Sequence, residues 1–81
     1  MGEVVHLKSG VLKEFLAKKN LSQNAFAERI QTTSGHLSQI LNGKRIPRPD
    51  TRERILNEVK RLQKFRGEPE FKFDDLFSIG S

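Results

Sequence analysis

The chain contains 81 residues, which is enough for one small domain and too few for a two-domain enzyme. It has no cysteine, which excludes disulfides, thiol catalysis and Cys-ligated metal sites, and no apolar run approaches the roughly 18 to 20 residues of a membrane span. We therefore expect a cytoplasmic protein that is neither exported nor bound to a membrane. Its net charge of +5 favours a polyanionic partner.

The charge is unevenly distributed and divides the chain into parts. Residues 44–66 carry nine basic and three acidic side chains, whereas residues 67–81 carry four acidic side chains and one lysine. The preceding residues are nearly balanced. We predict an N-terminal arm (1–9), a basic helical domain (10–66) and an acidic, Phe-rich C-terminal tail (67–81). A run of basic residues alone does not distinguish a solvated surface from a surface that binds nucleic acid.

The arm and the first helix have simple signatures. The β-prone run from Val4 to Leu7 predicts an extended arm. Apolar residues with helical spacing then predict a helix over 11–19, with Ser9 as its N-cap and Asn20 as a left-handed stop.

Two short helices follow, separated by a tight turn. Ser22 is placed to cap the first of them, which ends before Gln31. Thr33 is placed to cap a helix over 34–41, and Gly43 ends that helix because a residue in this position often needs a positive φ.

A loop and a longer helix complete the domain. Two prolines within 44–49 predict a loop. Asp50 and Glu53 form a capping-box pattern at the start of a helix that reaches about Lys64. The residues expected to face the core from all four helices are Val11, Leu12, Phe15, Leu16, Phe26, Ala27, Ile30, Leu37, Ile40, Leu41, Ile55, Leu56, Val59 and Leu62.

The two short helices and their turn form a helix-turn-helix arrangement. The outward face of the second, residues 34–39, holds only small or polar side chains, and a helix of this kind fits a major groove about 12 Å wide. The segments Ser22-Gln23-Asn24-Ala25-Phe26-Ala27-Glu28-Arg29-Ile30 and His36-Leu37-Ser38-Gln39-Ile40-Leu41-Asn42-Gly43-Lys44-Arg45-Ile46-Pro47 resemble the Cro/lambda-repressor (Xre) helix-turn-helix family. The resemblance covers about residues 11–62 and implies an all-α domain of four to five helices. The β-prone patterns of the two terminal segments add a short β arm to this expectation.

The resemblance also implies the roles of individual residues. The positions that would read DNA bases are Ser34, Gly35, His36 and Gln39. The positions that would contact phosphates are Gln23, Thr33, Asn42, Lys44, Arg45 and Arg48. Phosphate contacts supply most of the affinity and base contacts supply the specificity.

The chain departs from the family at three places. Gln31 stands where relatives usually have glycine. Either Gln31 adopts the left-handed conformation at a cost on the order of 1 kcal/mol, or the turn is slightly altered. Gly35 leaves Gln39 as the only base-reading amide that can contact adenine through two hydrogen bonds. The long stretch after Pro49 reads as one helix where many relatives have two.

No other chemistry is indicated. His6 and His36 have no partner at metal-ligand spacing, and no catalytic set or phosphate loop is present, so we expect no metal, no cofactor and no enzyme. The tail has two interpretations. It either folds back onto the helices or forms an interaction arm. In the arm, Phe71-Lys72-Phe73 pairs as a strand with Val4–Leu7, within the chain or across a dimer, and Asp74–Phe77 forms a contact helix.

Two functions fit these observations. The first is a sequence-specific double-stranded DNA-binding regulator, a repressor that binds a palindromic operator as a homodimer through the helix at 34–41. The second is an antitoxin or an auxiliary DNA-bound adaptor whose tail, residues 67–81, binds a partner protein.

Overall fold

The computed structural model describes residues 4–80, so the outermost residues of the predicted arm and tail, 1–3 and 81, lie outside the described part. The elements in chain order are β1 (Val4–Leu7), α1 (Ser9–Lys18), α2 (Gln23–Arg29), α3 (Ser34–Leu41), α4 (Pro49–Phe65), α5 (Phe73–Leu76) and β2 (Phe77–Gly80). This architecture confirms the predicted helical class with a short β arm.

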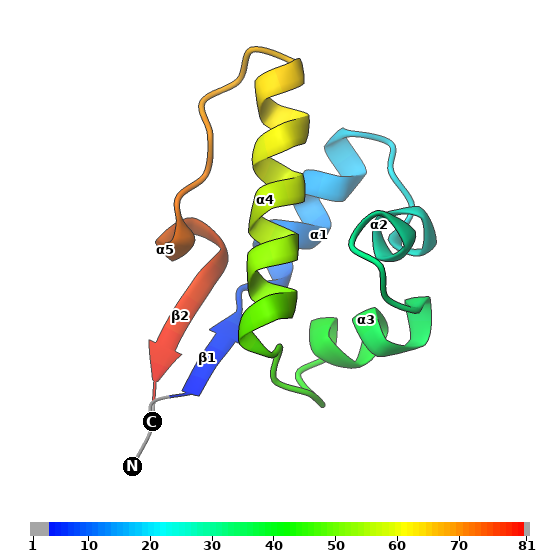
Figure 1. The fold of residues 1–81 in the computed structure, drawn as a ribbon, viewed down its shortest axis with the longest axis vertical. Coiled ribbons are helices and arrows are strands. Elements are labelled where there is room, and N and C mark those ends of the chain that lie inside the picture. Colours follow the sequence, from blue (N-terminus) through cyan, green and yellow to red (C-terminus); the bar gives the residue numbers. More distant parts are fainter. Residues whose placement is uncertain (1–3, 81) are drawn as a thin grey trace.

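Helix α4 runs along the length of the molecule and organises the other elements (Figure 1). Helices α2 and α3 lie on one side of it, and α5 and the two strands lie on the other. The stretch from Pro49 to Phe65 is a single helix, as predicted. No helix among residues 4–80 is long and apolar enough to cross a membrane.

One apolar core joins the helices and both strands. All the residues predicted to face inward are buried except Val11, Leu56 and Leu62, which are partly buried. The C-terminal segment adds Leu76 and Phe77, which are 0% and 1% exposed. Burying one such side chain is worth about 1.5–3 kcal/mol, so the tail is part of the folded domain.

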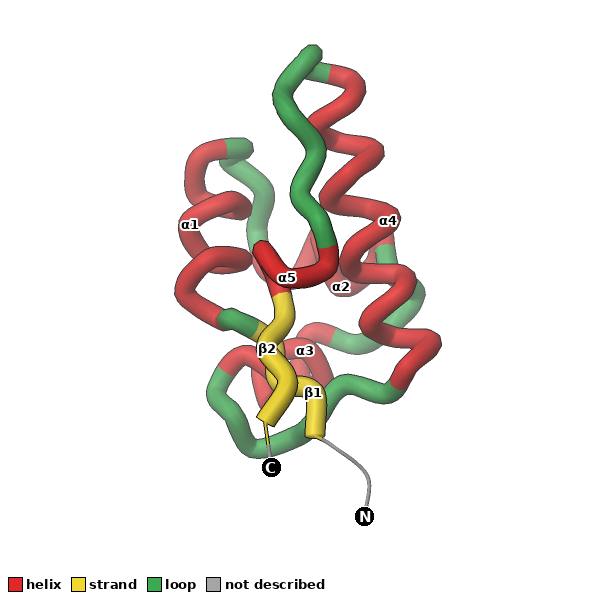
Figure 2. Tube along the Cα trace, turned by 90° about the vertical axis from the view of Figure 1, so that its left-hand side faces the viewer, coloured by secondary structure: helices red, strands yellow, loops and turns green. Residues whose placement is uncertain are grey.

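The connection from α4 to α5 lies along the helices. Figure 2 shows it passing between α1 and α4. The backbone N–H of Phe71 donates a 2.8 Å hydrogen bond to the side-chain oxygen of Gln63, and its ring lies 5.9 Å from that of Phe15. Lys19 forms an ion pair with Glu68. These contacts attach the acidic segment to α1 and α4.

The strand predicted at Phe71-Lys72-Phe73 is wrong. The strand that pairs with β1 is β2, in antiparallel register from Leu7 opposite Phe77 to Val4 opposite Gly80. Residues 71–73 cannot act as this strand because Phe71 is held by α4 and because Phe73 is already the first residue of α5. The N–H of Lys72 donates a 2.7 Å hydrogen bond to the Asp75 carboxylate, which stabilises that turn of helix.

Two predicted N-caps are also wrong. The N-cap residue of α1 is Lys8 and not Ser9. The N–H of Lys8 donates a hydrogen bond to the carbonyl of Leu76, so the first turn of α1 begins one residue earlier than predicted. Helix α4 begins at Pro49 with Arg48 as cap, and no capping side chain bonds there. A residue before proline favours extended backbone, and proline suits the first helical position, so Asp50 lies inside the first turn.

Candidate nucleic-acid interface

The turn between α2 and α3 has the predicted construction. Ser22 Oγ accepts a 3.0 Å hydrogen bond from the N–H of Ala25, and Thr33 Oγ1 accepts one of 3.1 Å from the N–H of His36. Gln31 adopts a φ of 60°, so the left-handed turn residue is retained without glycine. The N–H of Thr32 donates to the carbonyl of Ala27, which closes the turn. Both helix starts are therefore fixed by local hydrogen bonds.

Helix α3 is buried on one face and free on the other. Leu37, Ile40 and Leu41 are at most 4% exposed, which anchors the helix to the core. On the opposite side Ser34 and Gly35 are exposed, and a Cβ added at Gly35 would meet no atom within 4 Å. The outward edge near the start of this helix is thus slim enough to enter a groove.

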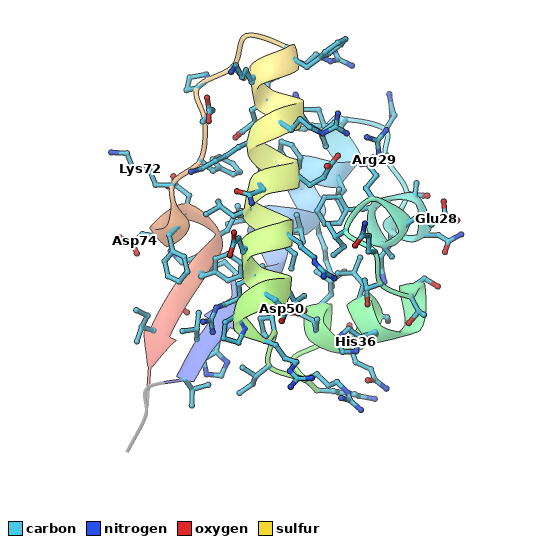
Figure 3. All side chains as sticks on the ribbon, viewed as in Figure 1. Glu28, Arg29, His36, Asp50, Lys72 and Asp74 are labelled. Atoms are coloured by element: carbon cyan, nitrogen blue, oxygen red, sulfur yellow. The ribbon has the colours of Figure 1, made fainter. Side chains whose placement is uncertain are left out.

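His36 differs from the other predicted base-reading residues. It is half-buried, whereas Ser34, Gly35 and Gln39 are exposed. Figure 3 labels it on α3, at the end of the molecule where α4 begins. The structure brings all four predicted base-reading residues onto this one short helix.

The loop after α3 folds back onto the end of the helix. The N–H groups of Lys44 and Arg45 both donate to the carbonyl of Gln39, at 2.8 and 3.2 Å. The Arg45 Nε also donates a 2.7 Å hydrogen bond to the Gln39 side-chain Oε1. Gly43 makes this return possible with a φ of 75°.

The predicted phosphate-contacting residues lie at the start of α2 and at the two ends of α3. Thr33, Asn42, Lys44, Arg45 and Arg48 are exposed, and Gln23 is half-buried at the start of α2. Four of the five exposed residues belong to the loop 42–48, which Pro47 anchors because its ring is buried. The structure therefore places three exposed cations in the loop that follows α3 and contacts Gln39 at its outward edge.

Sequence reasoning missed the ion pairs that fix α2 against α4. Glu58, 9% exposed, accepts hydrogen bonds from Arg29 on α2 at 3.1 Å and from Arg61 at 3.1 and 2.9 Å. The hydrogen bond to Glu58 and its negative charge raise the pKa of the Arg61 guanidinium. The only signal in the sequence was a glutamate among apolar core positions with an arginine three residues later.

No metal centre is found among the residues that the structure describes. Within 4–80, no group of three or more His, Cys, Asp and Glu side chains is arranged to hold a metal ion. The chemistry of the α3 face is that of hydrogen bonding and positive charge.

Comparison with known proteins assigns a family to this arrangement. The family model described as "Helix-turn-helix" matches residues 12–58, which include α2, α3 and every residue predicted to contact DNA. No curated protein and no solved structure matches the chain.

Proposed function

The chain belongs to the Xre-like (Cro/lambda-repressor) helix-turn-helix family of DNA-binding regulators, and we propose that it is a sequence-specific repressor that binds a palindromic operator as a homodimer. In this proposal α3 enters the major groove. Ser34, Gly35, His36 and Gln39 read base edges there.

The observation that carries the proposal is the division of α3 into two faces. Its apolar side chains are buried in the core, and its exposed edge consists of small and polar residues beside a cationic loop. Small polar side chains hydrogen-bond to base edges, and cations neutralise phosphates. Neither property is needed for packing, since Ser34, Gly35, Gln39 and the three loop cations are exposed.

The proposed phosphate contacts come from the start of α2 and from the two ends of α3. Gln23 and Thr33 lie at the starts of α2 and α3, and Thr33 Oγ1 already accepts the helix cap while its hydroxyl hydrogen remains available to a phosphate oxygen. The other contacts come from the loop after α3, through Asn42, Lys44, Arg45 and Arg48.

The length of the recognition helix supports a dimer. Helix α3 has 8 residues and is about 12 Å long, so one copy reaches only a few base pairs. Two copies related by a two-fold axis would read half-sites about 10 base pairs apart. Repression requires only that the bound protein covers a promoter. Because the proposed ligand is DNA, we place the protein in the cytoplasm with the nucleoid.

The adaptor function, in which the tail binds a partner protein, is less well supported. The apolar side chains Leu76 and Phe77 of the tail are buried in the core. Phe71 of the tail contacts Gln63 and Phe15. A partner could use them only after the domain had partly unfolded. We propose that the tail completes the fold.

Selection of bound sequences from a random duplex library at near-physiological salt, with the mass of the complex measured by light scattering, tests the proposal. The expected result is an enriched palindrome bound by two chains, and a promoter overlapping it should be silenced in transcription in vitro. Weak, strongly salt-dependent binding without a motif, or one chain per site, would overturn the proposal.

A further inference from the structure

The most exposed large apolar side chain within residues 4–80 lies far from the recognition helix. Phe65, at the end of α4, is 89% exposed, compared with 55% for Ile79 and 49% for Ile46. With Leu62 it forms part of an open groove of about 440 Å³, whose other lining residues are Arg29, Arg61 and Lys64.

The groove continues along α4 as a basic surface. A smaller hollow of about 270 Å³ shares Arg29 and Arg61 and extends to Arg54. The two hollows together are lined by four basic side chains and one acidic side chain, Glu58. Neither Arg54 nor Lys64 has an ion-pair partner among the described residues. The surface therefore carries excess positive charge.

The ion pairs of Glu58 fix the shape of this surface. Its carboxylate binds Arg29 from α2 and Arg61 from α4, and it is itself almost buried. Figure 3 shows Arg29 on α2 beside the upper half of α4, whereas His36 lies at the other end of the molecule. The two guanidinium groups are thus held in place before any partner arrives.

Distance separates this groove from the proposed DNA contacts. Phe65 lies sixteen residues after Pro49 on α4, a rise of about 24 Å at 1.5 Å per residue. The phosphate-contacting loop immediately precedes Pro49. The groove is therefore at the opposite end of α4 and stays accessible while α3 lies in a major groove.

We propose that this groove is a docking surface for an acidic segment of another protein that inserts one apolar or aromatic side chain between Phe65 and Leu62. The cations match acidic residues on either side of that anchor, and aromatic and arginine side chains are the residues that dominate protein interfaces. A phosphate backbone would use the cations but not the apolar end. A single-stranded nucleic acid stacks successive bases on several aromatic rings, and this groove has one.

The test begins with the full chain and a displayed library of random peptides. The expected consensus combines acidic residues with one large apolar residue. An enriched peptide is then titrated by fluorescence anisotropy against the wild-type protein, Phe65→Ser and Lys64→Glu. Each substitution should weaken binding by about tenfold or more, which corresponds to about 1.4 kcal/mol.

Matched variants control for general effects. Ile79→Ser removes another exposed apolar side chain, and Lys13→Glu reverses another exposed charge, and both should bind the peptide as the wild type does. Folding is not at risk in Phe65→Ser, since the ring is almost fully exposed.

Four results would overturn the proposal. The first is a peptide selection without an acidic and apolar consensus, and the second is peptide binding by Phe65→Ser equal to that of the wild type. The third is a tenfold loss of affinity for duplex DNA or for single-stranded DNA in both groove variants. The fourth is a lower mass in solution for Phe65→Ser than for the wild type. The third would identify the surface as a nucleic-acid contact and the fourth as an interface between copies of this chain. Since the wild-type selection of duplex DNA does not involve this groove, failure here leaves the proposed function intact.

Discussion

The Arg45 Nε donates a 2.7 Å hydrogen bond to Oε1 of Gln39, so the loop after α3 holds the amide group proposed to read a base. A carboxamide oxygen has two lone pairs, and the bond to Arg45 uses one of them. The second lone pair and the NH₂ group of Gln39 remain free, which is what a two-bond contact with the N6 and N7 positions of adenine requires. We therefore propose that Arg45 positions Gln39 in addition to its proposed phosphate contact.

This relationship predicts a specific effect of Arg45→Lys. Lysine keeps the positive charge but lacks the planar group that fixes the Gln39 amide. Affinity for random duplex DNA and its salt dependence should stay close to wild type, whereas the ratio of specific to random affinity should fall by up to about tenfold, or about 1.4 kcal/mol. Competition binding at several salt concentrations measures both. An unchanged ratio would show that the bond to Gln39 does not position it.

Gly35 and Gly10 form a matched pair for testing the DNA face. Each is the second residue of its helix, and a Cβ at either position meets no atom within 4 Å. Replacing either by alanine should raise the free energy of unfolding by about 0.5–1 kcal/mol, since glycine is the less favourable helix residue. Only Gly35→Ala should weaken operator binding, because its methyl group projects from the edge of α3 that is proposed to contact the bases. Equal DNA affinity of the two variants would contradict this account of Gly35.

Gln31→Gly should stabilise the protein. Gln31 adopts a φ of 60°, and a left-handed conformation costs a residue with a Cβ about 1–2 kcal/mol, which glycine avoids. Part of the gain is offset because glycine makes the unfolded chain more flexible. A net gain of about 1 kcal/mol would raise the melting temperature by about 4–8 °C in a domain of this size. A lower melting temperature would show that the Gln31 side chain stabilises the turn more than its conformation costs.

The folded tail is tested by Leu76→Ala. Leu76 is fully buried, so its truncation should cost about 2–5 kcal/mol of unfolding free energy in a denaturant titration. Ile79→Ala, at a half-exposed position of the same tail, should change stability much less. Similar small effects of both would mean that the tail does not belong to the core in solution.

Local sequence signals predicted the helix-turn-helix well. Ser22 and Thr33 cap their helices as expected, and Gln31 and Gly43 have the positive φ values that the turn and the helix end require. Each of these features depends on residues within a few positions of one another. The burial of Leu37 follows in the same way from helical spacing.

Features that depend on distant parts of the chain were not predictable. Helix α1 starts at Ser9 because the N–H of Lys8 donates a hydrogen bond to the carbonyl of Leu76. The strand that pairs with β1 is Phe77–Gly80 because Phe71 is hydrogen-bonded to α4. The alternation of apolar and polar residues in Phe71-Lys72-Phe73 is as typical of a strand as the sequence of Phe77–Gly80 is. Only the packing of the tail onto the helices decides which of the two segments pairs with β1.

The most direct test of base reading by α3 compares Gln39→Ala with Lys44→Ala on a selected duplex and a random duplex over a series of salt concentrations. Gln39→Ala should lose about 1–3 kcal/mol on the selected duplex and little on the random one. Lys44→Ala should weaken both duplexes equally and reduce the salt slope by about 0.9. Equal losses of Gln39→Ala on both duplexes would contradict the claim that α3 reads the DNA sequence.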